Sequence, residues 1–147
     1  MINGQIAQGF IDALGQFSAY RITIYDSQGN LVCSTMPEGL PAVSLDAVHV
    51  TSSGRPLGLE GPNGTRLLQP VEVEGTIMGC IELSGSGTDV HAVAAALKMS
   101  LEMRLRFEAI EKARRQEQSR DELLLRALLL GDGARGVSAT EALASAG

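Results

Sequence analysis

Side chains that could hold an anion are scarce in the first 90 residues. This stretch contains nine acidic residues and three basic ones, which are Arg21, Arg55 and Arg66. The rest of the chain is nearly balanced, with nine basic and eight acidic side chains, and the net charge is −5. If the first part binds an anion, the positive charge must come from these guanidinium groups or from backbone N–H groups at a helix N-terminus.

No pattern typical of an enzyme or a metal site accompanies the arginines. His49 and His91 have no second histidine three or four residues away, so a zinc site is not expected. Cys33 and Cys80 lie far apart in apolar runs, which favours buried, reduced thiols over a redox pair. Nucleophile-elbow, P-loop and dinucleotide-binding motifs are absent from the sequence. We expect no catalytic residue, no metal and no cofactor, haem and flavin included.

The composition indicates a cytoplasmic globular protein. The 147 residues suffice for one domain with an appendage, and 44% of them are hydrophobic. Only 3% are aromatic and the net charge is negative, which argues against a nucleic-acid platform with a basic groove and stacking rings. No apolar run approaches the roughly 18–20 residues of a membrane span, and no signal peptide opens the sequence. We therefore expect no contact with a membrane.

Hydrophobic periodicity predicts helices that alternate with antiparallel strands. Asn3 is a suitable N-cap for the first helix, and Glu74-Gly75 is a suitable two-residue turn for the last hairpin. In chain order, the expected elements are a helix at 3–17, strands at 19–25 and 31–35, a short helix at 42–52, an edge strand at 56–60, and strands at 66–73 and 76–84.

The last hairpin places two polar side chains in an apolar setting. Gln69 and Glu82 are expected on the same face of the sheet, among apolar neighbours. That pattern fits either a half-solvated face or a cavity lined for a ligand. The two-residue turn predicts the cross-strand pairs Val73–Thr76, Val71–Met78, Gln69–Cys80 and Leu67–Glu82.

A long helix is expected in the last third of the chain. No proline or glycine interrupts residues 88–130, and Ser86 or Thr88 can cap the helix start. Its first half carries a wide apolar stripe, and its end, at 123–130, is rich in leucine. Leucines left in water are a liability, so this run needs a second chain or a further domain as its partner. We expect a core at 1–86, a dimerising helix at 87–131, and a flexible tail or the start of another domain at 132–147.

The order of these elements resembles PAS-like and GAF-like sensors, which implies an α+β fold with an antiparallel sheet, flanking helices and a C-terminal signalling helix. Residues 69–85 (QPVEVEGTIMGCIELSG) also resemble the sugar-diacid recognition domain, the N-terminal sensor of bacterial carbohydrate diacid regulators. The shared features are Pro70, Gly75 in the turn, Gly79 before Ile-x-Leu, and Gly85. IAQGFIDALG, ITIYDSQGNLVCST and DELLLRALLLGD fit the same pattern, so the resemblance covers roughly residues 3–131.

The resemblance implies a sensor domain of a bacterial transcription regulator, with a small carboxylate such as a sugar diacid bound between the sheet and the short helix. Arg66 is the first candidate to bind the carboxylate, because a guanidinium group binds it bidentately. Ser34, Thr35, Gln69 and Glu82 are candidates to bind hydroxyl groups of the ligand.

The resemblance also predicts the partners of the domain. Two copies are expected to pair through the long helix, and DNA would be contacted by an output domain outside these residues. A ligand-free dimerisation or protein-interaction module, whose sheet core is filled by side chains, is the alternative.

Overall fold

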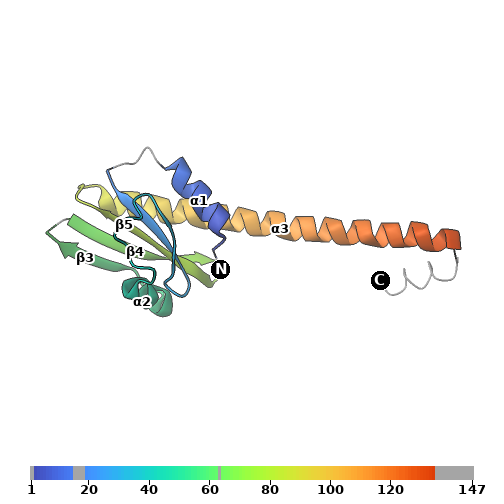
Figure 1. Ribbon diagram of the computed structural model, residues 1–147, viewed down its shortest axis with the longest axis horizontal. Helices are drawn as coiled ribbons and strands as arrows, with labels where there is room; N and C mark the ends of the chain where they lie inside the picture. Colours follow the sequence, from blue (N-terminus) through green and yellow to red (C-terminus); the bar gives the residue numbers. More distant parts are fainter. Residues whose placement is uncertain (1, 15–18, 63, 135–147) are drawn as a thin grey trace. The chain divides into compact units, whose positions relative to one another are not determined.

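In the described part of the chain, five antiparallel strands form one sheet in the order β2-β1-β5-β4-β3 (Figure 1). The computed structural model describes residues 2–14, 19–62 and 64–134. The predicted five-stranded sheet is confirmed, and the short strand with Gly58 lies at an edge as expected. The strands are β1 (Arg21–Asp26), β2 (Leu31–Ser34), β3 (Leu57–Gly61), β4 (Gly64–Val73) and β5 (Thr76–Gly85).

Two short helices flank the sheet. Helix α1 (Gly4–Ala13) begins after Asn3, whose side chain accepts a hydrogen bond from the backbone N–H of Gln5, so the predicted cap is confirmed. Most of the predicted continuation of this helix, at 15–17, lies outside the described residues. Helix α2 (Leu45–Ser53) begins after Ser44, whose hydroxyl accepts the N–H of Ala47, and it ends at Gly54 in the left-handed conformation.

The last helix, α3 (Val90–Ala134), contains the boundary between two compact units, Met1–Arg106 and Phe107–Gly147. The expected caps Ser86 and Thr88 are wrong. The helix begins directly after Asp89, whose carbonyl accepts the N–H of Val93. Asp89 also places a negative charge at the positive end of the helix dipole, which stabilises the first turn.

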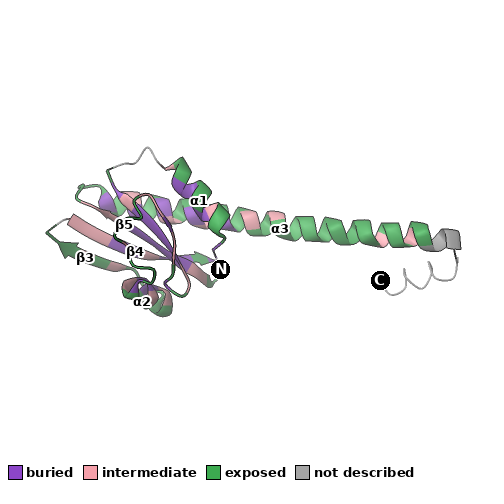
Figure 2. Ribbon diagram, viewed as in Figure 1, coloured by how far each residue is buried: buried purple, intermediate pink, exposed green. Residues whose placement is uncertain are grey.

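The first unit buries both faces of the sheet. Figure 2 shows the buried residues concentrated on the strands and on the helices beside them. On one face, residues of α1, the sheet and the first part of α3 form the larger cluster, and this includes Phe10, Ile22, Leu83, Leu97 and Leu101. On the other face, α2 packs over a smaller cluster of Tyr25, Ala47, Val50, Leu68 and Cys80.

The predicted register of the β4–β5 hairpin is correct at the turn and wrong beyond it. Val73 pairs with Thr76, but Val71 pairs with Gly79 instead of Met78, because a β-bulge adds one residue to β5. Gln69 therefore pairs with Ile81, and Leu68 pairs with Glu82. Since a shift of one residue moves every later side chain to the opposite face, the bulge separates Gln69 from Glu82.

Candidate functional site

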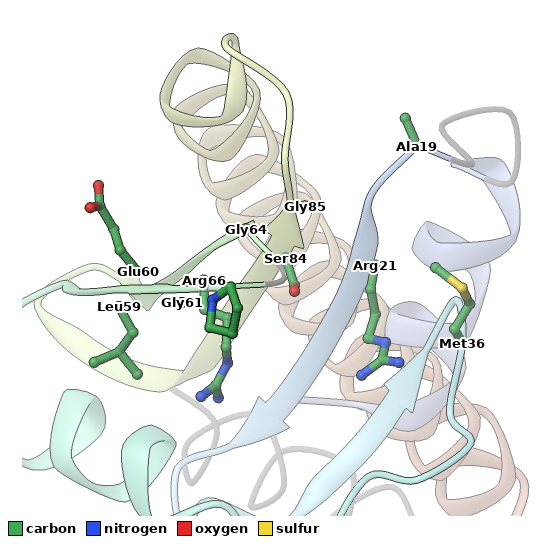
Figure 3. Close-up of a pocket in the computed structure, with 11 residues that line it drawn as sticks. Ala19, Arg21, Met36, Leu59, Glu60, Gly61, Gly64, Arg66, Ser84 and Gly85 are labelled. Atoms are coloured by element: carbon green, nitrogen blue, oxygen red, sulfur yellow. The ribbon is translucent and has the colours of Figure 1, made fainter.

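The strand register places two arginines on the face of the sheet that α2 covers. Arg21 of β1 and Arg66 of β4 both pair with Ser84 of the central strand β5. Residues that pair across neighbouring strands share a face, so these three form one row. Two inter-strand spacings separate the Cα atoms of the arginines by about 10 Å. Figure 3 shows both guanidinium groups extending to the same side of the sheet.

Two cavities open over this row. One has a volume of about 560 Å³ and the other of about 490 Å³, and both are lined by Arg21, Arg66 and Ser84. The shared lining makes them adjoining parts of one cleft, which we call the arginine cleft. The larger part is completed by residues from β3 and the end of β5, among them Leu59, Glu60 and Gly85. The smaller part is completed by Tyr25, Ser44, Leu45, Asp46 and Glu82.

Arg66 is held between two carboxylates. Its Nη2 donates to Glu82 Oε1 at 2.9 Å, and its Nη1 lies 3.4 Å from Asp46 Oδ2 at the start of α2. The side chain of Glu82 is only 3% exposed, whereas that of Asp46 is 43% exposed. The hydrogen bond to Glu82 is the main cause that raises the pKa of Arg66. Arg66 is thus a fixed positive charge, oriented by a buried partner and only loosely bound by an exposed one.

The N-terminal end of α2 forms part of the smaller cavity. Ser44, Leu45 and Asp46 line it, so the first turn of the helix, whose leading backbone N–H groups have no carbonyl partner within the helix, borders the cleft. Such N–H groups, together with the helix dipole, favour negative charge. Tyr25 also lines this cavity, and burial is the main cause that raises the pKa of its hydroxyl to about 12. Tyr25 is therefore a neutral hydroxyl at physiological pH.

Of the residues proposed from the sequence, the cleft contains Arg66 and Glu82. Ser34 lies on the edge strand β2, and its hydroxyl is 3.0 Å from that of Thr23 on the neighbouring strand. The hydroxyl of Thr35 accepts the backbone N–H of Ile22 at 3.0 Å. Both hydroxyls thus stabilise the β1–β2 pairing, and neither residue lines the two cavities of the cleft.

Gln69 lies on the opposite face of the sheet. It contacts a narrow, dry space beneath α3 that is lined by Leu67, Ile81, Ala94 and Leu97. Its Oε1 atom is buried and accepts no hydrogen bond within the described residues. The bulge is the physical reason for this position, because the register predicted from the turn alone would have put Gln69 beside Glu82.

No ligand contact was assigned to Arg21 from the sequence, although this arginine lines both cavities of the cleft. Strand alternation already placed Arg21, Thr23 and Tyr25 on one face of β1. That this face meets Arg66 becomes visible only when β5 is known to lie between β1 and β4. Arg55, the third arginine, is exposed after the end of α2 and lines neither cavity.

No group of three or more histidine, cysteine or acidic side chains in the described residues is placed to hold a metal ion. His49 and His91 lie on α2 and α3, as expected, and both are exposed. Both cysteines are buried as free thiols. A helix long and apolar enough to cross a membrane is not present among the residues that the structure describes.

Solved structures share the fold of this chain. The chain is similar to a protein in the crystal structure of the Escherichia coli DhaR(N)–DhaL complex, with a TM-score of 0.61 and 13% identity. The match covers 82% of this chain and 53% of that one, so the chain spans about half the length of this relative. A domain of a two-component sensor histidine kinase protein from Sinorhizobium meliloti 1021 matches at a TM-score of 0.52 and 14% identity, over 79% of this chain and 99% of that one.

A third structure, a GAF domain/HD domain protein from Geobacter sulfurreducens, matches at a TM-score of 0.48 and 14% identity, over 73% of this chain and 94% of that one. The expected PAS/GAF-like α+β fold is confirmed. A comparison with curated proteins found no match. The family model described as "Putative sugar diacid recognition" matches residues 2–128, and the chain therefore belongs to that family.

Proposed function

We propose that this chain is the ligand-sensing part of a bacterial cytoplasmic transcription regulator, and that it binds a small carboxylate such as a sugar diacid without catalysing a reaction. The observation that carries the proposal is the arginine cleft, in which Arg66 is oriented by buried Glu82 beside the N-terminus of α2. A guanidinium group and a helix N-terminus are both suited to bind a carboxylate. Membership of the sugar diacid recognition family supports the same class of ligand.

Binding would reach α3 through contacts on the far side of the sheet. Lys98 Nζ donates to the carbonyl of Pro70 at 2.6 Å, and Glu102 accepts the N–H of Glu72 at 2.7 Å. Lys98 and Glu102 are themselves paired at 2.6 Å, so α3 holds β4 on both sides of Val71 at the bulge. A ligand that displaces β4 would therefore strain these bonds. For a switch, the ligand must favour one state, typically by about 1–3 kcal/mol of coupling.

The test is thermal unfolding of the full chain with a panel of aldaric acids, aldonic acids and short dicarboxylates. A ligand at one hundred times its Kd stabilises the folded state by about 2.7 kcal/mol, which raises Tm by several degrees. We expect this rise for at least one acid, and we expect it to be lost in Arg66→Ala. Arg66→Lys retains a charge beside Glu82 and controls for the unpaired carboxylate that Arg66→Ala leaves. Arg55→Ala, outside the cleft, should behave like the wild type. If no acid raises Tm, carboxylate sensing is refuted.

We also propose that two copies pair through the second unit of the chain. Its helix exposes large apolar side chains with relative accessibilities of 56–71%, namely Phe107, Ile110, Leu123, Leu125, Leu129 and Leu130. Apolar surface of this kind is stabilised by a partner. Light scattering should give twice the monomer mass for the wild type, and monomers for the double variant Leu125→Gln/Leu129→Gln. The polar double variant Gln116→Ala/Gln118→Ala should remain dimeric.

A protein-interaction module without a small ligand is the second candidate. One observation favours it, since the similar E. coli protein was solved in complex with DhaL. Against it stands the polar, arginine-lined cleft, because such a module would have a sheet face filled by side chains. An absence of any acid-induced rise in Tm, together with an intact dimer, would favour this second candidate.

A further inference from the structure

Among the arginines of the first 90 residues, Arg21 combines two features. It lines a cavity, and it forms no ion pair with a described residue. It is half-buried and lines both parts of the arginine cleft. Within the described residues it forms no ion pair, whereas Arg66 has two carboxylate partners. Arg55 likewise forms no ion pair with a described residue, but it is exposed to solvent outside the cleft. A partly desolvated guanidinium group without a carboxylate is a position where a ligand anion would be stabilised.

The two arginines of the cleft are arranged as a pair. They flank Ser84 in one row, with about 10 Å between their Cα atoms, and their side chains extend to the same side (Figure 3). The Ser84 hydroxyl makes no side-chain hydrogen bond within the described residues, so it is available between the two cations. The row therefore presents, in order, a cation, a hydroxyl and a cation.

We propose that Arg21 is the specificity-determining residue of this site, and that it selects acids with a carboxylate at both ends over acids with one. This inference rests on the proposed function. One carboxylate would bind Arg66, in the place of exposed Asp46, while the second binds Arg21 and a hydroxyl of the ligand meets Ser84. Glu82 would keep its bond to Arg66 throughout, because its side chain is only 3% exposed and lies 2.9 Å from Nη2.

Charge balance explains why the second carboxylate matters. Glu82 and Asp46 together offset the charge of Arg66, so a ligand with one carboxylate has to compete with them there or use Arg21 alone. A ligand with two carboxylates gains a charge-assisted contact at Arg21 in addition. A hydrogen bond to a charged group is typically strong enough for a difference of at least about tenfold in Kd.

The experiment is calorimetric titration of the full chain with acids matched in carbon number and hydroxyl configuration. The probes are galactarate against galactonate, and glucarate against gluconate. The variants are Arg21→Gln, Arg21→Lys and, as a matched control outside the cleft, Arg55→Gln. Thermal unfolding without ligand checks that each variant folds, and half-exposed Arg21 should tolerate both changes with little change in Tm.

For the wild type and Arg55→Gln, we expect at least one diacid to bind at least about tenfold more tightly than its monoacid. In Arg21→Gln this ratio should fall close to one, and Arg21→Lys should restore part of it. A wild type that binds acids without preference for diacids would overturn the inference and leave the proposed function standing. A preference that survives in Arg21→Gln would overturn it in the same way. A wild type that binds none of the four acids would count against both.

Discussion

The hydroxyl of Tyr20 donates a hydrogen bond to the carboxylate of Asp89. Tyr20 directly precedes Arg21 at the start of β1, and Asp89 directly precedes α3. Glycine at position 87 makes this contact possible, because a Cβ atom there would lie 2.0 Å from the Tyr20 hydroxyl. Tyr20, the neighbour of Arg21 in the chain, is thus hydrogen-bonded to Asp89, the residue that precedes α3. This contact is a second connection between the sheet and α3, at the opposite end of β4 and β5 from the Lys98–Pro70 contact.

Tyr20→Phe should loosen the first turn of α3. The substitution retains the ring but removes the hydrogen bond to Asp89, whose carbonyl accepts the N–H of Val93. We expect faster amide hydrogen exchange at Val93. Tyr25→Phe removes the other tyrosine hydroxyl, on the α2 face, and should leave this amide unchanged. Equal exchange at Val93 in wild type and Tyr20→Phe would show that the contact does not hold the helix start.

The same contact predicts a pH dependence. The hydrogen bond to Asp89 is the main cause that raises the pKa of Tyr20. A group whose pKa is raised by folding contributes stability below its unfolded pKa, which is about 10 for tyrosine, and loses it as the pH rises through the folded value. The wild type should therefore lose stability relative to Tyr20→Phe above about pH 10. Denaturation by urea at a series of alkaline pH values measures this, and parallel curves would contradict it.

Gly79→Ala should destabilise the sheet. A Cβ atom at this position would lie 2.2 Å from the carbonyl oxygen of Tyr25 and 2.6 Å from Ile2 Cδ1. The first of these atoms belongs to the backbone of a paired strand and cannot move aside cheaply, so we expect a loss of about 1–3 kcal/mol or more. Gly61→Ala is the matched control, because its Cβ would have no heavy atom within 4 Å. Urea denaturation compares the two, and equal stability of both variants would refute the steric explanation.

The thiols should be unreactive in the folded protein. Burial is the main cause that raises the pKa of Cys80 to about 12 and that of Cys33 to about 11. Both are then protonated near pH 8, where an ordinary thiol of pKa about 8.5 is partly ionised and nucleophilic. We expect no reaction with an aromatic disulfide reagent until the protein unfolds. Ser119→Cys, on an exposed turn of α3, should react at once, and rapid reaction of the wild type would show that a thiol is accessible.

The elements of the fold could be predicted from local pattern, because each depends on residues near in sequence. Asn3 caps its helix as predicted, and Glu74-Gly75 forms the predicted turn that pairs Val73 with Thr76. Ser44, expected inside the short helix at 42–52, is instead its N-cap. The β-bulge could not be predicted in this way. Beside the bulge, Gly79 lies against the backbone of Tyr25, more than 50 positions earlier in the chain. Such a contact is set by packing of the whole sheet and leaves no periodic signal.

The candidate site depended on this same long-range information. Arg66 stood out as a cation at the start of a strand, and Glu82 as a carboxylate in an apolar run. Their 2.9 Å contact arises because the bulge moves Glu82 to the face of Arg66. Arg21 joins them only through the placement of β5 between β1 and β4. Gln69 was grouped with Glu82 for the opposite reason, since a hairpin without a bulge would have joined them.

Asp46→Asn should strengthen the binding of a diacid. Asp46 lies 3.4 Å from Arg66, with both side chains about 40% exposed, so the pair contributes only about 0–1 kcal/mol to stability. In the proposed complex its carboxylate competes with the ligand for Arg66 and repels it. Removing the charge should lower the Kd for galactarate several-fold, although it also removes a negative charge from the first turn of α2, at a cost of about 0.3–1 kcal/mol in stability.

Glu60→Gln is the control that distinguishes competition between Asp46 and the ligand for Arg66 from the general effect of negative charge in the cleft. Glu60 also lines the cleft and carries one negative charge, but it forms no ion pair with Arg66 in the described residues. If Asp46 competes for Arg66, calorimetric titration with galactarate should show a larger gain in affinity for Asp46→Asn than for Glu60→Gln. Equal gains would mean that only the overall charge of the cleft matters. A lower affinity in Asp46→Asn would mean that Asp46 orients Arg66 for the ligand, and the direct exchange of one carboxylate for another would have to be abandoned.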